Sequence, residues 1–427
     1  MCFVLQTYDD HFTKMLQRFA TTVTPPQKCN ILNLCLSIIL SRSPVILKIL
    51  QQKLFVMKYK YFGLLLLVSV LILTGCRKQI PTIVQDTEVL SGPPPGGGTT
   101  PPPVIPPLTC LAPVLTSSLI LTDRVGPNLD GPFSTASFTS AEDLVLHSAG
   151  YLYIIERVNR RIRKVDPIAN TISTLYTFPS TSEIPNAIAT DATGNIYVTT
   201  SANVVRKFNN LGSLLAVYGT PGVGGYADGA TPRFRDPGGL AVDASGRIYV
   251  ADRGNFRIRM ISTTGLVTTL AGNPAGASYL DGPATSVRLR ILKDLVVSSD
   301  GSTVYFSDYF ALRRIYAGQI NTIAGKLDLP VSPTHVDGYL GTSQFFYISS
   351  IAMDSWNRLY VTDGPPDGTP SILSRVEIGN PILGWNVKTL NGSLGNPLPA
   401  VSVNQSGSTI YYSQPSWSIS RATVSCP

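Results

Sequence analysis

A short apolar segment containing tyrosine recurs six times between residues 150 and 412, and no other feature restricts the fold of this sequence as strongly. The central tyrosines of the six copies are Tyr153, Tyr197, Tyr249, Tyr305, Tyr360 and Tyr411, spaced 44, 52, 56, 55 and 51 residues apart. Repeats of about 40 to 50 residues are typical of β-propeller blades, whereas solenoid repeats are usually shorter. The spacing therefore predicts an all-β, six-bladed β-propeller.

The third unit indicates how one blade is built. Its apolar segments cover residues 240–242, 247–251, 256–261 and 266–271. The turn after the first segment contains Asp243, which can bond its own turn, and Gly246, which can adopt a positive φ. These signals predict four antiparallel strands in each blade. Such a sheet buries both faces only against neighbouring blades, so the units are expected to close into a ring.

The two ends of the repeat region predict how the ring closes. The sixth unit, residues 400–424, supplies three strands and then ends, while residues 118–122 form an apolar segment without a blade of its own. We therefore expect the N-terminal strand to complete the last blade of a domain covering residues 110–427.

The N-terminal region carries a targeting signal. Residues 57–75 combine Lys58 and Lys60 with the uncharged run 62–73, an arrangement typical of a signal peptide, and residues 73–76 resemble a bacterial lipobox. The resemblance implies that Cys76 becomes a lipidated N-terminus and anchors the protein in a membrane. Because Arg77 is not the aspartate associated with inner-membrane retention, we expect an outer-membrane lipoprotein of the bacterial cell envelope, facing either the periplasm or the surface.

Two further segments flank this signal. Residues 1–56 do not fit in front of a signal peptide, so Met57 is the preferred start; a real upstream extension is the alternative. Residues 76–109 are rich in proline and glycine and show no hydrophobic periodicity, which predicts an extended tether.

Net charge excludes one class of partner. The chain has 34 basic and 26 acidic residues, but 8 basic and 2 acidic residues precede Gly75, leaving 26 and 24. A nearly neutral domain lacks the clustered lysine and arginine that nucleic-acid binding requires. We therefore expect no nucleic-acid partner, and a monomer.

Residues 237–272, with Asp-Arg-Gly-Asn-Phe-Arg-Ile-Arg at 252–259, resemble an NHL repeat, and residues 156–163 repeat its core. Of the Asn-His-Leu triplet that names the family, only Asn159 and Asn255 match. The resemblance implies the propeller fold. It leaves function open, because family members range from protein-binding and RNA-binding modules to relatives of lyases.

Cys110 and Cys426 flank the predicted closure of the ring. In an oxidising compartment we expect them to form a disulfide, which would stabilise the closed ring by restricting the unfolded chain. Two free thiols are the alternative.

An arginine recurs in the third strand of every unit, and four units carry an acid at the end of strand two. A ring of cations for an anionic ligand is one interpretation. Pairing of each arginine with an acid or with backbone carbonyls is the favoured one, because regular repetition serves architecture. The residues are Arg163, Arg206, Arg259, Arg314, Arg375 and Arg421, with Glu156, Asp252, Asp308 and Asp363.

A second repeat, Asp-Gly, lies in the long connectors between blades. Asp-Gly is primarily a turn signal, so loop shaping is the leading interpretation. Variable aromatic and polar residues beside it are nevertheless candidates for ligand binding, because aromatic rings suit contacts with sugars or peptides. The ligand-binding candidates are Tyr226, Asp228, Tyr279, Asp281, His335, Asp337, Arg253, Asn255, Tyr309 and Trp417.

No catalytic residue can be assigned from the sequence. The domain has only His147 and His335, too few for the multi-histidine zinc site of lyases that resemble this fold. Asp252, Asp308 and Asp363 are the candidates for a metal site; no cofactor is predicted, and calcium is the one ion such carboxylates could hold.

The favoured function is a lipid-anchored binding module for an envelope protein or glycan, and the balance leans away from an enzyme. The alternatives are a divalent-metal lyase or lactonase and a non-catalytic envelope scaffold.

Overall fold

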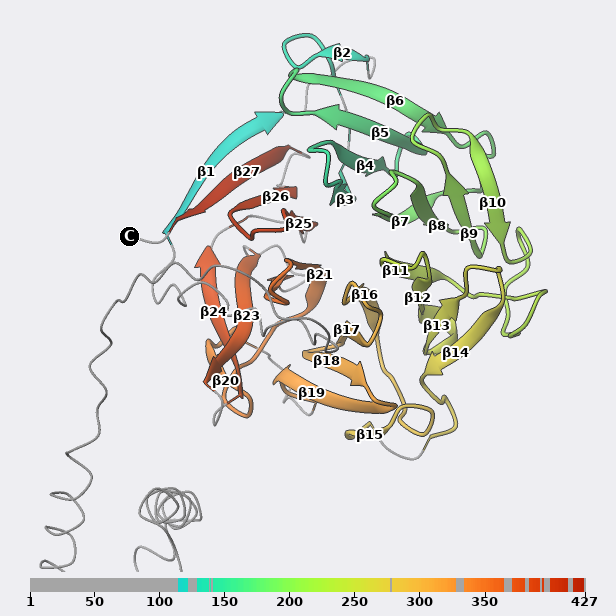
Figure 1. The fold of residues 1–427 in the computed structure, drawn as a ribbon, viewed down its shortest axis with the longest axis vertical. Coiled ribbons are helices and arrows are strands. Elements are labelled where there is room, and N and C mark those ends of the chain that lie inside the picture. The colour runs from blue at the N-terminus through green and yellow to red at the C-terminus, as the bar shows by residue number, and fades with distance from the viewer. Residues whose placement is uncertain are drawn as a thin grey trace, which may run out of the picture. The chain divides into compact units, whose positions relative to one another are not determined.

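The protein forms a ring of six antiparallel β-sheets, shown in Figure 1. The computed structural model describes residues 114–121, 129–137, 139, 141–276, 279–327, 334–364, 371–380, 384–391, 394, 400–413 and 418–425. The predicted signal peptide, Cys76, the tether, Trp417 and the proposed Cys110–Cys426 disulfide lie outside these residues. Within the described part, no helix is long and apolar enough to cross a membrane.

Each blade runs outward from an inner strand at the centre of the ring to an outer strand at its rim (Figure 1). Blade one contains β3 (Asp143–Leu146), β4 (Leu152–Glu156), β5 (Arg161–Asp166), β6 (Thr171–Thr177) and β2 (Gly131–Pro132). Blade two contains β7 (Pro185–Thr190), β8 (Ile196–Thr200), β9 (Val204–Phe208) and β10 (Leu214–Tyr218). Blade three contains β11 (Pro237–Val242), β12 (Ile248–Asp252), the 3-10 turn η1 (Arg253–Asn255), β13 (Arg257–Ile261) and β14 (Val267–Ala271).

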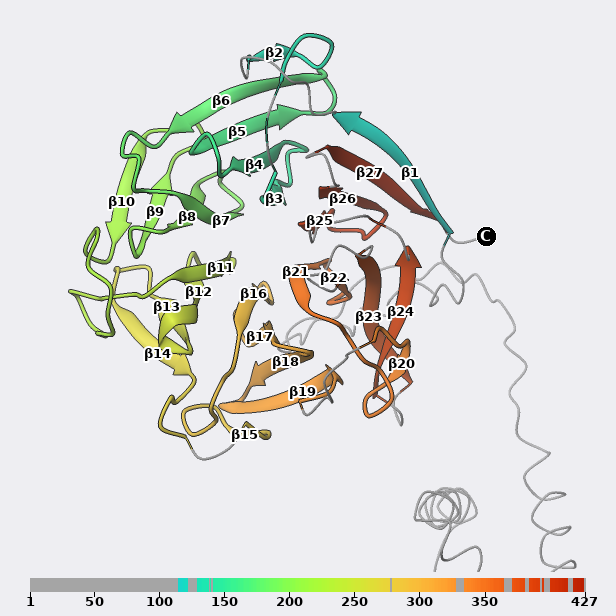
Figure 2. The ribbon, with the colours of Figure 1, turned by 180° about the vertical axis from the view of Figure 1, so that it is seen from behind.

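The remaining blades complete the ring, and Figure 2 shows it from behind. Blade four contains β16 (Leu292–Val297), β17 (Thr303–Asp308), β18 (Ala311–Tyr316), β19 (Gln319–Gly325) and β15 (Gly282–Pro283). Blade five contains β21 (Ile348–Met353), β22 (Leu359–Asp363), β23 (Ile372–Asn380), β24 (Gly384–Asn391) and β20 (Gly338–Tyr339). Blade six contains β25 (Val401–Val403), β26 (Thr409–Ser413), β27 (Ile419–Ser425) and β1 (Val114–Leu121).

The N-terminal strand closes the ring as expected. β1 pairs antiparallel with β27, placing Val114 opposite Ser425 and Leu121 opposite Ile419. The last blade therefore combines both ends of the propeller sequence, so the first and last parts of the domain must fold together.

Neighbouring blades pack face to face through apolar clusters. Between blades two and three, Tyr197 and Val205 pack with Leu240 and Val250, all of them buried. The second strands β4, β8, β12, β17 and β22 are buried along their whole length, because they have a neighbouring blade on both faces. Burial on both faces explains why these strands are the most recognisable segments of the sequence.

The recurring tyrosine links blades through its hydroxyl group. The Tyr249 hydroxyl donates to Asp243 at 3.1 Å and to the carbonyl of Gly301, in blade four, at 3.4 Å. Tyr360 makes the matching contacts with Asp354 and with the carbonyl of Gly407, in blade six. A side chain that is apolar in its body and polar at its tip suits this position.

The four-strand prediction is correct for the main strands but omits a fifth, two-residue strand in three blades. The Asp-Gly connectors supply it: β2, β15 and β20 each begin at the glycine of an Asp-Gly pair and join the outer strand of a blade. In blade three, Gly229 forms only an isolated bridge with Val267. These additions cover sheet edges that would otherwise leave backbone groups unpaired.

Candidate functional site

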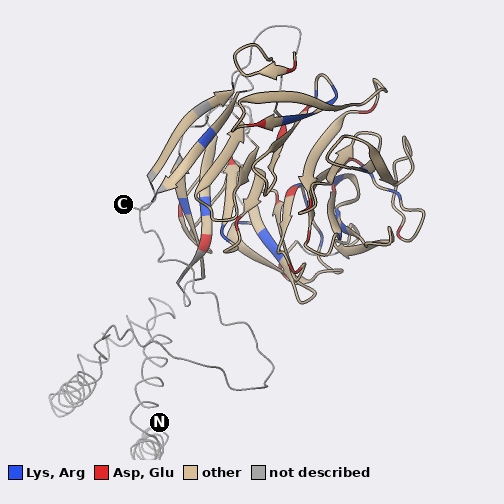
Figure 3. Ribbon diagram, turned by 45° about the horizontal axis from the view of Figure 1, so that its top comes forward, with Lys and Arg blue, Asp and Glu red and all other residues tan. Residues whose placement is uncertain are grey.

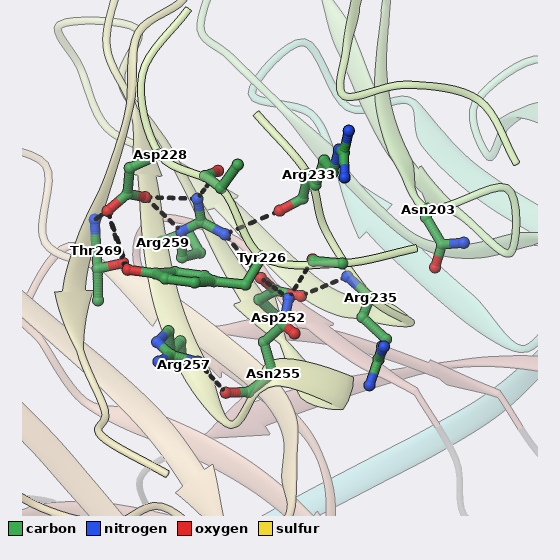
Figure 4. Close-up of polar contacts among 12 residues, drawn as sticks. Asn203, Tyr226, Asp228, Arg233, Arg235, Asp252, Asn255, Arg257, Arg259 and Thr269 are labelled. Atoms are coloured by element: carbon green, nitrogen blue, oxygen red, sulfur yellow. Dashed lines mark hydrogen bonds and ion pairs between the residues drawn. The ribbon is translucent and has the colours of Figure 1, made fainter. Parts of the chain in front are cut away.

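The repeated arginines of strand three hold each blade to its Asp-Gly connector. In blade three, fully buried Arg259 bonds buried Asp252 at 2.9 Å and the connector residue Asp228 at 3.0 Å, as Figure 4 shows. Asp228 also accepts hydrogen bonds from the backbone and hydroxyl of Thr269 on the outer strand. We call this arrangement of acid, arginine and connector aspartate the latch.

Blades one and four contain the same latch. Arg163 bonds Glu156 and Asp130, and Arg313 bonds Asp308 and Asp281. Blade two uses a shorter version in which Arg206 pairs with Glu183. In these four blades a strand-three arginine therefore pairs with acids and has the structural role that the sequence favoured.

Three of the arginines singled out in the sequence are one residue out of register: Arg314, Arg375 and the exposed Arg421 lie opposite the recurring tyrosine, whereas Arg259 lies opposite the residue after it. Arg313, rather than Arg314, occupies the latch position in blade four, because it lies two residues beyond Ala311, the partner of Asp308. In blade five the equivalent residue is Ser374 rather than Arg375, which pairs with Glu377 instead. The sequence alone does not show which residue of strand three faces the acid of strand two. In blade four the two candidate arginines are adjacent, and in blade five the latch position holds no arginine.

His335 replaces the missing arginine of blade five. Its Nδ1 lies 3.1 Å from Asp363 and its Nε2 lies 3.1 Å from Asp337, which are the blade-five equivalents of the two acids that Arg259 bonds in blade three. Burial disfavours the charge on His335, but hydrogen bonds and attraction from Asp337 and Asp363 outweigh burial and raise its pKa to about 9.

We expect this latch to make stability depend on pH. Because the folded pKa of about 9 exceeds the ordinary value of 6.5, the stabilisation is complete below pH 6.5 and is lost as the pH rises toward 9. Urea denaturation between pH 6 and 9.5 should show wild type losing about 2 kcal/mol more than His335→Gln over this window. Parallel curves for the two proteins would contradict the ionic role of His335.

Most of the residues predicted to bind ligand or metal belong to the latches or contact them. Asp228, Asp281, Asp337 and His335 lie with the outer strands at the rim of the ring. The Tyr226 hydroxyl bonds Asp228 and Thr269, and its ring lies over Arg257 and Arg259 (Figure 4). Asn255 is buried and donates to Asp252 and to the carbonyl of Gly225.

The predicted metal-binding acids do not come together. Asp252, Asp308 and Asp363 belong to three different blades, and each bonds a cationic side chain of its own latch. Within the described residues, no group of three or more histidine, cysteine or acidic side chains could hold a metal ion. Each of these carboxylates is therefore engaged within its own blade.

A different set of polar residues meets at the centre of the ring. A cavity of about 90 Å³ lies on the axis, at the end where the inner strands begin. Its lining consists of consecutive residues at the starts of successive inner strands, together with Arg253 from η1. The lining residues are Glu142, Asp143, Asn186, Ala187, Gly238, Gly239, Arg253, Lys293, Asp294, Ser349, Ser350 and Ala400. We call this cavity the axial pocket.

Two aspartates of the axial pocket also tie neighbouring inner strands together. Asp143 accepts the backbone N–H of Ile188 at 2.8 Å, and Asp294 accepts that of Ile351 at 2.8 Å. Burial and repulsion from Asp294 raise the pKa of Asp143 to about 8, and burial raises that of Asp294 to about 6.

Lys293 differs from the other charges of the pocket. Its ammonium group lines the pocket and donates no hydrogen bond to any described residue. Burial, followed by repulsion from Arg253, lowers its pKa. Elsewhere in the described propeller, enclosed cations such as Arg259 are hydrogen-bonded. An enclosed cation without an acceptor is costly unless something else supplies one.

One lining residue of the pocket, Arg253, has aromatic rings in its surroundings. The Arg253 side chain lies against the inner strand, since a Cβ atom at Gly238 would be 2.7 Å from its Cδ atom, and its guanidinium pairs with Asp236 at 2.7 Å. Tyr309 and Tyr347 meet edge to face at 6.5 Å, close enough to Arg253 that its charge acts on the Tyr347 hydroxyl. Of the ligand-binding candidates, Arg253 thus lines the axial pocket.

Sequence reasoning missed Glu142, Asp143, Asn186, Lys293 and Asp294. Aligning the repeats by their inner strands would have found them, because they occupy the two positions just before the aligned apolar residues Leu144, Ile188 and Leu295, where other blades have glycine, alanine or serine. The signal that could have identified the axial pocket is a charged side chain at a position where other blades have a small residue.

Comparison with known proteins supports the fold. The NHL repeat pattern matches residues 234–259, in blade three. No protein with a curated description matches the sequence. The chain is thus a six-bladed β-propeller that carries an NHL repeat.

Similar solved structures are propellers of low sequence identity. A structural genomics protein of unknown function from Bacteroides thetaiotaomicron is 16% identical, with a TM-score of 0.53 over 74% of this chain and 77% of that chain. Auxiliary nutrient binding proteins from Bacteroides ovatus and Bacteroides thetaiotaomicron are 12% and 13% identical, with TM-scores of 0.52 and 0.51. They cover 74% and 73% of this chain, and 78% and 77% of their own chains. At these identities the likeness shows the fold alone.

Proposed function

We propose that this protein is a glycan-binding module of the bacterial cell envelope, displayed on a lipid anchor at Cys76, with a polar group of the ligand entering the axial pocket. The observation that carries the proposal is the Lys293 ammonium, which lines the pocket without a hydrogen-bond acceptor among the described residues. A ligand oxygen would supply that acceptor.

The chemistry of the pocket favours a hydroxyl-bearing ligand. Lys293 and Arg253 offer donors and Glu142 offers an acceptor, while a sugar hydroxyl both donates and accepts. A volume of about 90 Å³ admits a few water molecules or one functional group rather than a whole sugar ring. The paired rings of Tyr309 and Tyr347, of which Tyr347 feels the charge of Arg253, would contact the apolar face of the sugar that remains outside.

Two further points are in keeping with a binding role. The description of two propellers of this fold as auxiliary nutrient binding proteins agrees with it. The acids considered for the enzyme alternative, Asp252, Asp308 and Asp363, are each paired with a cationic side chain of their own blade.

Lys293→Met should abolish most glycan binding while leaving the fold intact, because methionine fills the same space without the donor. We expect wild type to bind hydroxyl-rich oligosaccharides on a glycan array and the variant to lose at least about tenfold in affinity. Lys388→Met, on outer strand β24, is the matched control and should bind like wild type. Equal binding by both variants would rule out the axial pocket, and binding only to envelope proteins would rule out the glycan.

A further inference from the structure

The walls of the axial pocket satisfy all but one of the polar side chains that line it. Asn186 donates to the carbonyl of Pro237 at 3.1 Å, and Glu142 accepts the backbone N–H of Arg157 at 2.9 Å. The two serines of the lining bond neighbouring strands, and its arginine pairs with an acid. Lys293 is the lining residue whose polar side chain has no partner among the described residues.

The two aspartates of the lining use their oxygen atoms to join the inner strands. Asp143 and Asp294 each accept two backbone N–H groups, one from the same strand and one from the next blade, at 2.8 to 2.9 Å. A Cβ atom at Gly239 would collide with Asp294, so this side chain packs closely against blade three. The walls therefore engage these carboxylates, while the Lys293 donors are left for a ligand.

A second cation without a partner acts on the same pocket. Arg157 directly follows β4, its backbone bonds Glu142 in the lining, and its exposed guanidinium pairs with no described residue. Burial lowers the pKa of Lys293, and repulsion from Arg253 and Arg157 adds to this effect, whereas attraction from the two aspartates opposes it. The charge of Arg157 therefore reaches the axis, where unpartnered donors outnumber acceptors.

We propose that the group entering the axial pocket is the carboxylate of an acidic sugar, such as a uronic acid, an inference that rests on the proposed glycan-binding function. The Lys293 ammonium would donate to a carboxylate oxygen in a charge-assisted hydrogen bond, which is stronger than a neutral one. The guanidinium of Arg157 would add attraction from outside the lining. A bound carboxylate would also favour the charged form of Lys293.

Size and hydrogen-bonding capacity favour a carboxylate over a hydroxyl group at this position. A cavity of about 90 Å³ admits a group of a few heavy atoms and excludes the sugar ring that carries it. A carboxylate brings two acceptor oxygens and no proton, so it needs no acceptor in the pocket. Glu142 remains as an acceptor for a neighbouring hydroxyl group of the same sugar.

Calorimetric titration of the full-length protein with trigalacturonate, its methyl ester and its carboxyl-reduced form, galactotriose, tests this inference. The three sugars share one linkage and differ at the carboxyl group. We expect wild type to bind trigalacturonate at least about tenfold more tightly than either neutral sugar, and Lys293→Met to bind all three alike. Lys293→Arg, which keeps the cation, should retain part of the preference.

Arg157→Gln tests the second cation. It should weaken trigalacturonate binding by about two- to fivefold, because Arg157 is exposed and its charge is screened by water, and should leave the neutral sugars unaffected. Arg421→Gln is the matched control, because Arg421 is an exposed arginine on β27 that does not line the pocket. Equal effects of the two substitutions would remove Arg157 from the site.

Three results would overturn the inference. These are equal affinity of wild type for the acidic and neutral sugars, an acidic preference that survives in Lys293→Met, and tighter binding of triglutamate or inorganic phosphate than of trigalacturonate. Neutral sugars that bind wild type equally well and lose affinity in Lys293→Met would contradict the carboxylate alone and leave the glycan function standing. Failure of every sugar to bind would contradict both.

Discussion

Replacing Arg259 with methionine should lower the free energy of unfolding by about 3 to 5 kcal/mol. Arg259 and Asp252 are both fully buried, so the substitution leaves a carboxylate inside the protein without its cation. It also releases Asp228, and with it the connector that the latch holds against the outer strand. Urea denaturation followed by circular dichroism would measure the loss.

Two variants separate the buried charge from the loss of side-chain volume. Arg257→Met is the matched control, because Arg257 lies two residues away on the same strand and forms no ion pair with an acid among the described residues. It should cost less than about 1 kcal/mol. Adding Asp252→Asn to Arg259→Met should restore part of the lost stability, since it removes the unpaired charge. Equal losses for Arg257→Met and Arg259→Met would contradict the latch.

The second large effect is expected at Gly301, where two blades meet. Its φ is +71°, and a Cβ atom there would collide with the Arg247 guanidinium and the Asp243 carboxylate and lie 2.7 Å from the Tyr249 hydroxyl. Gly301→Ala therefore combines left-handed backbone strain of about 1 to 2 kcal/mol with overpacking of about 1 to 3 kcal/mol. We expect a total loss of about 2 to 5 kcal/mol in urea denaturation.

Gly318→Ala isolates the strain. Gly318 has a nearly identical φ of +72°, but a Cβ atom there would have no neighbour within 4 Å. It should cost only the backbone term of about 1 to 2 kcal/mol. If both alanine variants lost the same amount, the contact between the Tyr249 network and blade four would contribute nothing measurable.

The fold could be predicted from the sequence because its signals are local and repeated. The strand containing Tyr249 is buried on both faces, so its apolar pattern survives in every blade. Closure by the N-terminal strand followed from counting three strands at one end and one at the other. The short edge strand at Gly282 could not be counted in this way, because two residues carry no periodicity.

The axial pocket was harder to predict for a physical reason. Lys293 and Asp294 lie next to each other in the sequence, yet their meaning comes from Glu142 and Asn186, more than 100 residues away, which the ring brings to the same axis. The charges most visible in the sequence, such as Arg259, repeat because the architecture needs them in each blade. Charges that break the repeat, as Lys293 does, are more informative about binding. Charged residues are sparse along the ribbon and spread over the blades, so no block of charge marks the axis (Figure 3).

The central claim is that the axis binds ligand while the repeated charges at the rim maintain the fold. Isothermal titration of the strongest array ligand into wild type, Lys293→Met and Lys388→Met tests it most directly. We expect unchanged affinity for Lys388→Met and at least about a tenfold loss, equal to about 1.4 kcal/mol, for Lys293→Met at unchanged unfolding free energy. Wild-type affinity in Lys293→Met would contradict it.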